Sequence, residues 1–128
     1  MDEEEIRIPL ICLKWSDWVP WNDLSLDARY EGGIRVPNGV PGVYEVRRAD
    51  SEERLTIGKA SNLRFRIKQG LIKGKTAHST GENIRAHEDV HRLLVRWAQT
   101  DRPAAAEEDL HLKHRAKYGR LPNYTKHT

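Results

Sequence analysis

Three side chains that can act on a phosphate group occur between residues 44 and 66 of the chain: Tyr44, Lys59 and Arg66. A lysine and an arginine stabilise the negative charge that develops when a phosphate is attacked. A free phenol has a pKa near 10, and positive charge close to it favours the ionised form. A phenol, an ammonium and a guanidinium brought to one place therefore indicate chemistry on a phosphodiester, and so a nucleic acid as partner.

The residues around this trio predict a β-hairpin followed by a helix. Residues 42–48 alternate in the manner of a strand that begins at a Pro-Gly turn. Residues 54–58 form a second strand after a short polar connection, so that the two strands make a hairpin. Ser61 is the expected N-cap of a helix that runs to about residue 73. Three side chains spaced by four residues give that helix one apolar face: Leu63, Ile67 and Leu71.

The second half of the chain predicts a third strand and two more helices. Residues 73–82 have the composition of a loop, residues 83–90 that of a short helix, and residues 91–99 that of a strand. A final helix begins at Pro103 and is expected to stop at Gly119. The order of elements is that of an α+β domain.

Length and composition suit a single globular domain with a modest core, since the chain has 128 residues of which 38% are hydrophobic. No apolar run approaches the roughly 18 residues that a membrane span needs, so no membrane is expected as a partner. The acidic start is unlike a secretory leader, and the single cysteine, Cys12, excludes an internal disulfide framework. These features predict a cytoplasmic protein.

Residues 1–40 are expected to form an N-terminal extension that packs on a domain made by residues 41–128. The extension carries three tryptophans at intervals of three residues, Trp15, Trp18 and Trp21, a spacing compatible with a short helical turn and an apolar lid. Packing against the core is the favoured role for such large side chains. A platform on which nucleic-acid bases stack is the alternative.

The charge of the chain is divided between its two parts. Residues 1–53 hold six Lys and Arg against twelve Asp and Glu, whereas residues 54–128 hold sixteen against seven. Seven basic residues and no acid occur between Arg54 and Gly81. Such a stripe attracts a polyanion with an affinity that falls as salt rises, although a solvated helix face has the same composition.

Two segments of this region resemble the half-motifs of the GIY-YIG nuclease family: Gly42-Val43-Tyr44 and Thr56-Ile57-Gly58-Lys59-Ala60. The following Asn62-Leu63-Arg64-Phe65-Arg66 is similar to the arginine segment of the family, in particular in the N-terminal nuclease domain of the bacterial excision-repair nuclease and in homing-type endonucleases. The resemblance covers about residues 40–123. It implies a small three-stranded antiparallel sheet flanked by helices. It also implies a metal-dependent endonuclease that hydrolyses phosphodiester bonds, with DNA favoured over RNA.

The resemblance assigns a role to each member of the trio. Tyr44 corresponds to the tyrosine that activates or orients the attacking water, and Lys59 to a lysine that supplies positive charge near it. Arg66 corresponds to the arginine that binds the scissile phosphate and stabilises its charge. Gly42 and Gly58 are the motif glycines, and Gly58 permits a close approach of the backbone where the strand ends.

The resemblance also implies one divalent metal ion, Mg²⁺ or Mn²⁺, held by a single glutamate on the last helix. Glu107 fits the family pattern, because an aliphatic residue, Leu110, follows it by three positions. Glu108 projects roughly 100° away from Glu107 and is the reserve candidate. For either acid the plain alternative is a carboxylate that only complements the helix dipole.

Three positions depart from the family pattern. The tyrosine of the second half-motif is Thr56, and the position four residues after the arginine is Gly70, where the family often has His or Tyr. Asn123 lies further from Glu107 than the terminal asparagine of the family. His78 resembles a histidine of the homing-type members and is suited to proton transfer, although a lone loop histidine is often incidental.

Four further basic side chains are expected to bind the nucleic-acid backbone: Arg64, Lys68, Lys73 and Lys75. On a helix that turns about 100° per residue, Arg64 and Lys68 fall together on the flank away from Arg66. No separate recognition domain is visible. Specificity for a target would therefore come from residues 1–40, from loops, from dimerisation or from a partner protein.

Two other functions are compatible with the sequence. A GIY-YIG fold that has Thr56 and Gly70 at those positions can bind nucleic acid without cutting it. In addition, the segment His87-Glu88-Asp89-Val90-His91 satisfies the H-E-x-x-H pattern of zinc metalloproteases. In that pattern two histidines one helical turn apart bind zinc and the glutamate acts as base. Asp89 is an unusual residue inside it, and a strand is expected to begin near His91.

Overall fold

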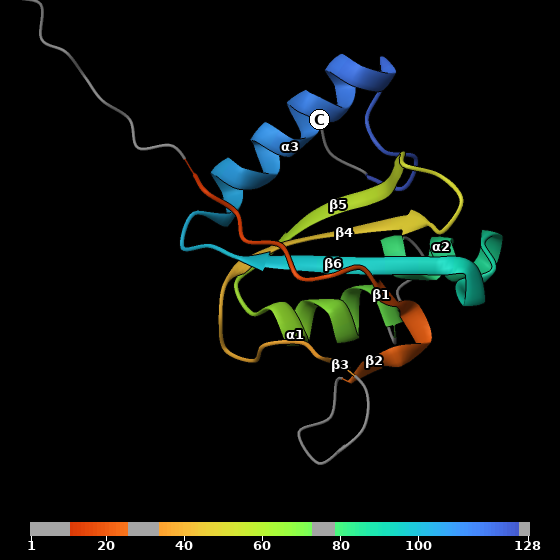
Figure 1. The fold of residues 1–128 in the computed structure, drawn as a ribbon, viewed down its shortest axis with the longest axis horizontal. Coiled ribbons are helices and arrows are strands. Elements are labelled where there is room, and N and C mark those ends of the chain that lie inside the picture. The colour runs from red at the N-terminus through yellow and green to blue at the C-terminus, as the bar shows by residue number, and fades with distance from the viewer. Residues whose placement is uncertain (1–10, 26–33, 73–78, 126–128) are drawn as a thin grey trace, which may run out of the picture.

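The computed structural model describes residues 11–25, 34–72 and 79–125, and it has an α+β architecture. A four-stranded antiparallel sheet runs in the order β1 (Val19–Pro20), β6 (Leu93–Gln99), β4 (Gly42–Arg48) and β5 (Arg54–Ala60). Helix α3 covers one face of the sheet and α1 lies on the other (Figure 1). The α+β class is as expected, but the expected number of three strands in the sheet is wrong.

The additional strand comes from the N-terminal part of the chain. Strand β1 (Val19–Pro20) pairs with β6 (Leu93–Gln99) through Val19 and Val95. A 3₁₀ turn, η1 (Trp21–Asp23), follows, and then β2 (Leu24–Ser25) pairs in parallel with β3 (Ile34–Arg35). A strand of two residues carries too little alternation to be recognised in a sequence, which explains the missed element.

The expected hairpin is confirmed as strands β4 (Gly42–Arg48) and β5 (Arg54–Ala60). Their register places Tyr44 opposite Gly58, so the two half-motifs face each other across the hairpin. Strand β4 also pairs with β6 along its whole length and is therefore a central strand, while β5 lies at the edge of the sheet.

The helix after the hairpin is α1 (Leu63–Ile67), which continues as a π-helical turn, η2 (Lys68–Ile72). Its expected apolar face is confirmed, because Leu63, Ile67 and Leu71 are completely buried. The expected N-cap at Ser61 is wrong by one residue. Asn62 holds that position, and its side-chain oxygen accepts hydrogen bonds from the backbone N–H groups of Phe65 and Gly39.

Two further helices, α2 and α3, and one 3₁₀ turn complete the described fold. Helix α2 (Thr80–His87) begins earlier than expected, because the Ser79 hydroxyl caps it by accepting from the Glu82 N–H. A 3₁₀ turn, η3 (Val90–Arg92), leads into β6. Helix α3 (Pro103–Tyr118) begins and ends as expected, with proline in its first turn and Gly119 in the left-handed conformation (φ 76°) after its end.

The core consists of two clusters, one on each face of the sheet. The larger cluster lies on the α1 face and contains Trp21, Tyr44 and Trp97 together with the aliphatic residues of α1, η2 and α2. The smaller lies under α3 and contains Val43, Ala98 and Ala106. Within the described ranges, no helix is both long and apolar enough to cross a membrane.

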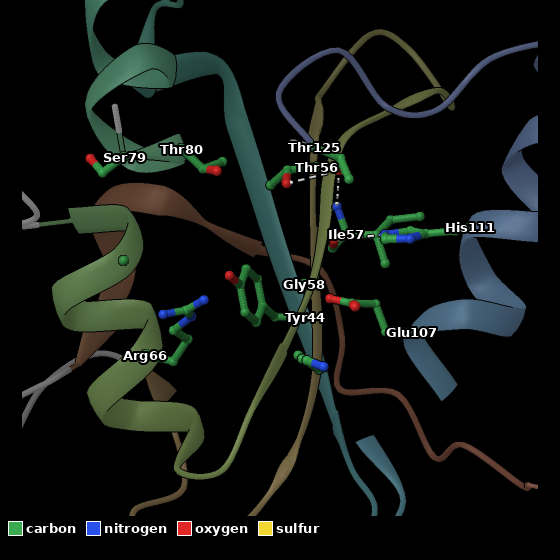
Figure 2. A pocket seen from close by; sticks show the side chains of 12 residues that line it. Tyr44, Thr56, Ile57, Gly58, Arg66, Ser79, Thr80, Glu107, His111 and Thr125 are labelled. Carbon is green, nitrogen blue, oxygen red and sulfur yellow. Dashed lines mark hydrogen bonds between the residues drawn. The ribbon is translucent and has the colours of Figure 1, made fainter. Parts of the chain in front are cut away.

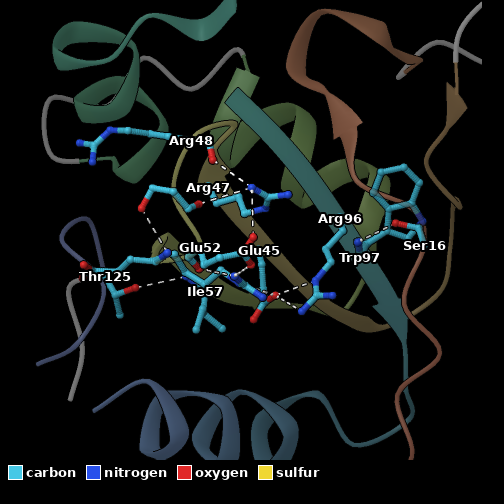
Figure 3. A network of polar contacts seen from close by, with 12 residues as sticks. Ser16, Glu45, Arg47, Arg48, Glu52, Ile57, Arg96, Trp97 and Thr125 are labelled. Carbon is cyan, nitrogen blue, oxygen red and sulfur yellow. Dashed lines mark hydrogen bonds and ion pairs between the residues drawn. The ribbon is translucent and has the colours of Figure 1, made fainter. Parts of the chain in front are cut away.

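A polar network on the α3 side of the sheet joins the N-terminal segment to the strands (Figure 3). We call it the arginine–tryptophan cluster, and it consists of Glu45, Arg47, Arg54, Arg96, Trp15 and Trp18. Glu45 is 2% exposed and accepts from Arg54 Nε at 3.0 Å and from Arg96 Nε at 2.7 Å. The Trp18 ring lies 4.5–4.9 Å from the guanidinium carbons of all three arginines. The tryptophans therefore do not form the helical turn that their spacing suggested.

Candidate functional site

A pocket of about 220 Å³ opens at the edge of the sheet formed by β5. In Figure 2, Tyr44 and Arg66 lie on one side of the β4–β5 hairpin, and Glu107 and His111 lie on the other. The pocket is lined by twelve residues: Tyr44, Thr56, Ile57, Gly58, Lys59, Arg66, Gly70, Ser79, Thr80, Glu107, His111 and Thr125. Four of the five side chains expected to do chemistry, from β4, β5, α1 and α3, are in this set, and the fifth, His78, lies outside the described residues.

The absence of a side chain at Gly58 makes room for the Tyr44 ring. A Cβ atom built at Gly58 would lie 2.4 Å from both Cζ and the hydroxyl oxygen of Tyr44, far inside van der Waals contact. The ring therefore lies across the glycine, with its hydroxyl at the pocket. Gly42 has a related role, because a Cβ there would lie 2.3 Å from the carbonyl oxygen of Ala98 on β6. The two motif glycines thus allow close packing, one for a ring and one for a strand.

Tyr44 is 5% exposed, and this burial is the main reason that the pKa of its phenol is raised above the ordinary value. Arg66 opposes the shift through its charge and a hydrogen bond to the phenol, and the negative charge of Glu107 reinforces it. The phenol is therefore neutral at neutral pH and serves as a hydrogen-bonding group.

The charged residues of the pocket have no partners of opposite charge in the part of the chain that the structure describes. Glu107 is half-buried, whereas Lys59 and Arg66 are exposed. Within residues 11–25, 34–72 and 79–125, no ion pair joins Glu107, Lys59 or Arg66 to another residue. Glu108, the reserve candidate, is exposed and does not line this pocket. The pocket thus holds two cations and one carboxylate whose charges are available to a ligand.

Thr56, which stands where the half-motif that it resembles has a tyrosine, lies beside a second threonine, Thr125. The Thr56 and Thr125 hydroxyl oxygens are 3.3 Å apart, and Thr125 Oγ1 also accepts from the backbone N–H of Ile57 at 3.3 Å. The C-terminal segment reaches this place because Tyr124 N–H donates to the Leu55 carbonyl on β5. Sequence reasoning missed Thr125, since nothing near it indicates that the chain returns to the edge strand.

Asn123 does not take part in the pocket. Its side chain is exposed, and the residue lies in the turn that precedes Thr125. Gly70 does line the pocket, and a Cβ there would lie 3.3 Å from Arg66 Cδ. The side chain that the family often has at this position would therefore press against Arg66.

The other expected nucleic-acid contacts lie outside the pocket or outside the described residues. Arg64 is half-buried, and its Nε donates to the Val36 carbonyl at 2.8 Å, so part of its role is to hold the segment before β4. Lys68 is half-buried at the end of α1. Lys73, Lys75 and His78 lie outside the described residues.

The H-E-x-x-H pattern does not lie on one helix. Helix α2 ends at His87, and His91 belongs to the separate turn η3, so the two rings are not one helical turn apart. Glu88 is bound by Arg48 Nε and Nη2, both at 2.7 Å, and by the Tyr124 hydroxyl at 2.9 Å. These bonds lower the pKa of Glu88 and occupy the carboxylate that a protease would use as its base. The arrangement lacks the geometry of a zinc site.

A metal ion at the pocket would depend on few protein ligands. Among the residues that the structure describes, no group of three or more His, Cys, Asp and Glu side chains is placed to hold a metal ion. A hard cation such as Mg²⁺ is commonly held by one or two carboxylates together with water and substrate phosphate. The Glu107 carboxylate, which lines the same pocket as Tyr44 and forms no ion pair with a described residue, fits an ion of that type.

Neither a family model, nor a curated protein, nor a solved structure matches the chain.

Proposed function

We propose that the protein is a metal-dependent nuclease that hydrolyses phosphodiester bonds, with DNA favoured over RNA. One observation carries the proposal: Tyr44, Lys59, Arg66 and Glu107 line the same pocket, although they come from four different elements. These are the positions that the resemblance to the GIY-YIG family assigns to the reaction. Their convergence was not imposed by sequence proximity, since Glu107 lies far along the chain from the other three.

Arg66 and Lys59 bind the phosphate in the proposed reaction. Both are exposed at the pocket and have no carboxylate partner in the described part of the chain, so no internal ion pair has to break before a phosphate binds. A guanidinium offers two parallel N–H donors to phosphate oxygens, and an ammonium adds a compact positive charge. Both charges stabilise the transition state more than the ground state, because negative charge on the phosphoryl oxygens increases during attack.

Tyr44 orients the attacking water. Its phenol is neutral in the free protein, since burial raises its pKa. A neutral hydroxyl that also interacts with Arg66 accepts one hydrogen bond and donates another, which fixes the direction of a water molecule beside the phosphate. The raised pKa favours this positioning role over that of a phenolate base.

Glu107 would hold Mg²⁺ or Mn²⁺. When bound, such an ion stabilises the negative charge on the phosphate oxygens and on the departing oxygen. Glu107 lies across the hairpin from Arg66, and both line the pocket. The phosphate would therefore bind between the Glu107 carboxylate and the Arg66 guanidinium.

The surface beside the pocket supports a nucleic acid as the substrate. Phe65 lies next to Arg66 on α1 and is 62% exposed, which is unusual for a large apolar side chain. Exposed aromatic rings on a basic surface stack with nucleic-acid bases. Phe65 would therefore contact a base next to the phosphate that Arg66 binds.

A second candidate function is binding of nucleic acid without cleavage. The observation that favours it is the hydrogen-bonded threonine pair, Thr56 and Thr125, at the place where the family has a second phenol. The side chain of threonine is shorter than that of tyrosine, and the Thr56 hydroxyl already forms a hydrogen bond with Thr125.

The two functions are separated by incubating the full chain with supercoiled plasmid, single-stranded DNA or RNA in Mg²⁺ or Mn²⁺. The nuclease proposal expects cleavage by the wild-type protein and its loss in Tyr44→Phe, Arg66→Ala and Glu107→Ala. Cleavage retained by all three variants would refute the assigned site. Binding of the same nucleic acids in a gel-shift assay, without any cleavage in either metal, would establish the second candidate.

A further inference from the structure

His111 lies one helical turn after Glu107 on α3, and both side chains reach the same space. Each lines the edge pocket and also an adjoining hollow of about 420 Å³ along α3. Residues four apart on a helix have Cβ atoms about 5–6 Å apart, close enough for both to contact one ion. The resemblance to the nuclease family assigns His111 no role, although the residue shares a helix face with Glu107, and the position of its ring indicates one.

One nitrogen of the His111 ring is fixed by the edge strand. Nε2 lies 3.1 Å from the carbonyl oxygen of Ile57 on β5. A carbonyl oxygen only accepts, so Nε2 must carry the hydrogen of this bond. In the neutral ring the lone pair is therefore on Nδ1.

The other nitrogen is available to a ligand. Nδ1 of His111 makes no hydrogen bond to any described part of the chain. It is also not one of the unpartnered side-chain atoms that are sealed from solvent, which in the described residues are Arg47 Nε, Glu82 Oε2 and His114 Nε2. The His111 ring is 8% exposed and lines the edge pocket, so a nitrogen without a hydrogen-bond partner among the described residues lies in the same pocket wall as Glu107.

His114, one turn further along α3, shows what a purely structural histidine looks like in this protein. Its Nδ1 lies 2.7 Å from the Arg120 carbonyl, and its Nε2 is buried 3.7 Å from Glu53. Both of its nitrogens thus face the protein. His111 differs in that one nitrogen is bound by a backbone carbonyl while the other has no partner among the described residues, and a ligating histidine usually has its second nitrogen bound in this way.

We propose that Nδ1 of His111 and the carboxylate of Glu107 hold the metal ion together. This proposal rests on the proposed function in one respect, the role of Glu107 as a ligand. A site with one imidazole and one carboxylate favours first-row transition-metal ions over Mg²⁺, because nitrogen ligands suit the former and Mg²⁺ strongly prefers oxygen. The natural ion would then be Mn²⁺ or a later member of the series such as Co²⁺.

The test is pulsed electron paramagnetic resonance of Mn²⁺ bound to the full chain, without nucleic acid. Coordination by His111 predicts a nitrogen coupling in the spin-echo modulation, and this coupling should change when the histidines are labelled with ¹⁵N. It should disappear in His111→Gln and persist in His114→Gln. A glutamine amide can still donate to the Ile57 carbonyl, so the edge contact is retained in the His111 variant.

Affinity gives a second readout. By isothermal titration calorimetry, His111→Gln should bind Mn²⁺ at least about tenfold more weakly than wild type, while its Mg²⁺ affinity changes by less than about twofold. Glu107→Gln should weaken binding of both ions. An equal loss for both ions in His111→Gln would contradict a nitrogen ligand.

The outcomes separate this proposal from the proposed function. If Mn²⁺ binds through Glu107 but the wild-type spectrum shows no nitrogen coupling, His111 is a structural residue and the nuclease proposal stands. If the coupling is present and no nucleic acid is cleaved, the metal site is established and the nuclease proposal fails. If Mn²⁺ does not bind at the pocket of the free protein, the joint site of His111 and Glu107 is overturned, and the nuclease proposal is decided by the cleavage assay alone, because substrate phosphate supplies further ligands to such an ion.

Discussion

Strand β4 carries two neighbouring residues, Tyr44 and Glu45, that belong to two differently built polar regions of the protein. Glu45 is the centre of the arginine–tryptophan cluster, in which Arg54 and Arg96 both bind its carboxylate and Trp18 stacks on both guanidinium groups. Tyr44 lies on the other face, at the edge pocket. Both regions contain arginine, glutamate and aromatic side chains, so composition alone does not distinguish them.

The difference lies in how the charges are paired. In the arginine–tryptophan cluster the buried carboxylate is bound at 2.6–3.0 Å by two guanidinium groups. In the pocket, Arg66 and Glu107 lie on opposite sides of the hairpin, and neither forms an ion pair with a described residue. Paired buried charges hold a fold together, whereas separated unpaired ones leave their charge for a ligand.

The first prediction concerns the stability of the arginine–tryptophan cluster. Replacing Glu45 with Ala removes the carboxylate that binds two half-buried arginines and leaves Arg54 only its 3.9 Å ion pair with Glu52, which should lower the free energy of unfolding by about 3–5 kcal/mol. Urea unfolding followed by circular dichroism measures this change. The matched control is Glu107→Ala, which should lie within about 0.5 kcal/mol of wild type because no ion pair is lost. Equal destabilisation by both substitutions would remove the contrast between the two regions.

The second prediction concerns catalysis in the pocket. Arg66→Ala should reduce the rate of DNA cleavage by about 10²–10³-fold, the effect of removing one donor to the developing charge. Its free energy of unfolding should change little, because the side chain is exposed and forms no ion pair with a described residue. Arg66→Lys should recover part of the rate. If Arg66→Ala lost activity and stability together, Arg66 would stabilise the fold in the way that Arg54 and Arg96 do.

The third prediction tests the packing of Tyr44 on Gly58. Gly58→Ala puts a Cβ 2.4 Å from the Tyr44 ring, so the ring must move, at a cost of about 1–3 kcal/mol in unfolding free energy. Cleavage should fall as well, since the phenol leaves its place. Combining Gly58→Ala with Tyr44→Ala should relieve the clash, and a double-mutant cycle measures this coupling. Additive effects would mean that the two residues do not press on each other.

The fourth prediction tests the role of Trp18 beside the arginines. Trp18→Leu should lower the free energy of unfolding by about 1–2 kcal/mol, because the aromatic contacts to three guanidinium groups are lost. Trp18→Phe should lose less, and cleavage should be unchanged in both. A variant of normal stability that binds DNA poorly would instead assign Trp18 to the base-stacking platform considered from the sequence.

The parts of the fold that were predictable from the sequence are those specified by neighbouring residues. The β4–β5 hairpin, the buried face of Leu63, Ile67 and Leu71, and the end of α3 at Gly119 all follow from local alternation, helical spacing or a glycine cap. The grouping of Tyr44, Lys59, Arg66 and Glu107 was predicted only through the resemblance to a family. Local pattern does not determine which helix approaches an edge strand.

The features that the sequence did not reveal depend on contacts between distant residues. The tryptophan spacing suggested a helical turn, but Trp15 and Trp18 are placed by arginines on three strands that lie far away in the chain. Thr125 reaches the pocket through a hydrogen bond of its neighbour to β5, and His111 through the Ile57 carbonyl. Backbone groups at a sheet edge attract such partners, and a sequence does not mark them.

The most direct test of the central claim compares Glu107→Gln with Glu108→Gln in metal-dependent plasmid cleavage. These neighbours differ in position, since Glu107 lines the edge pocket and Glu108 does not, and both are on the same turn of α3. We expect cleavage by wild type in Mg²⁺ or Mn²⁺, a loss of about 10³-fold in Glu107→Gln, and nearly full activity in Glu108→Gln. Cleavage by Glu107→Gln at the wild-type rate would contradict it.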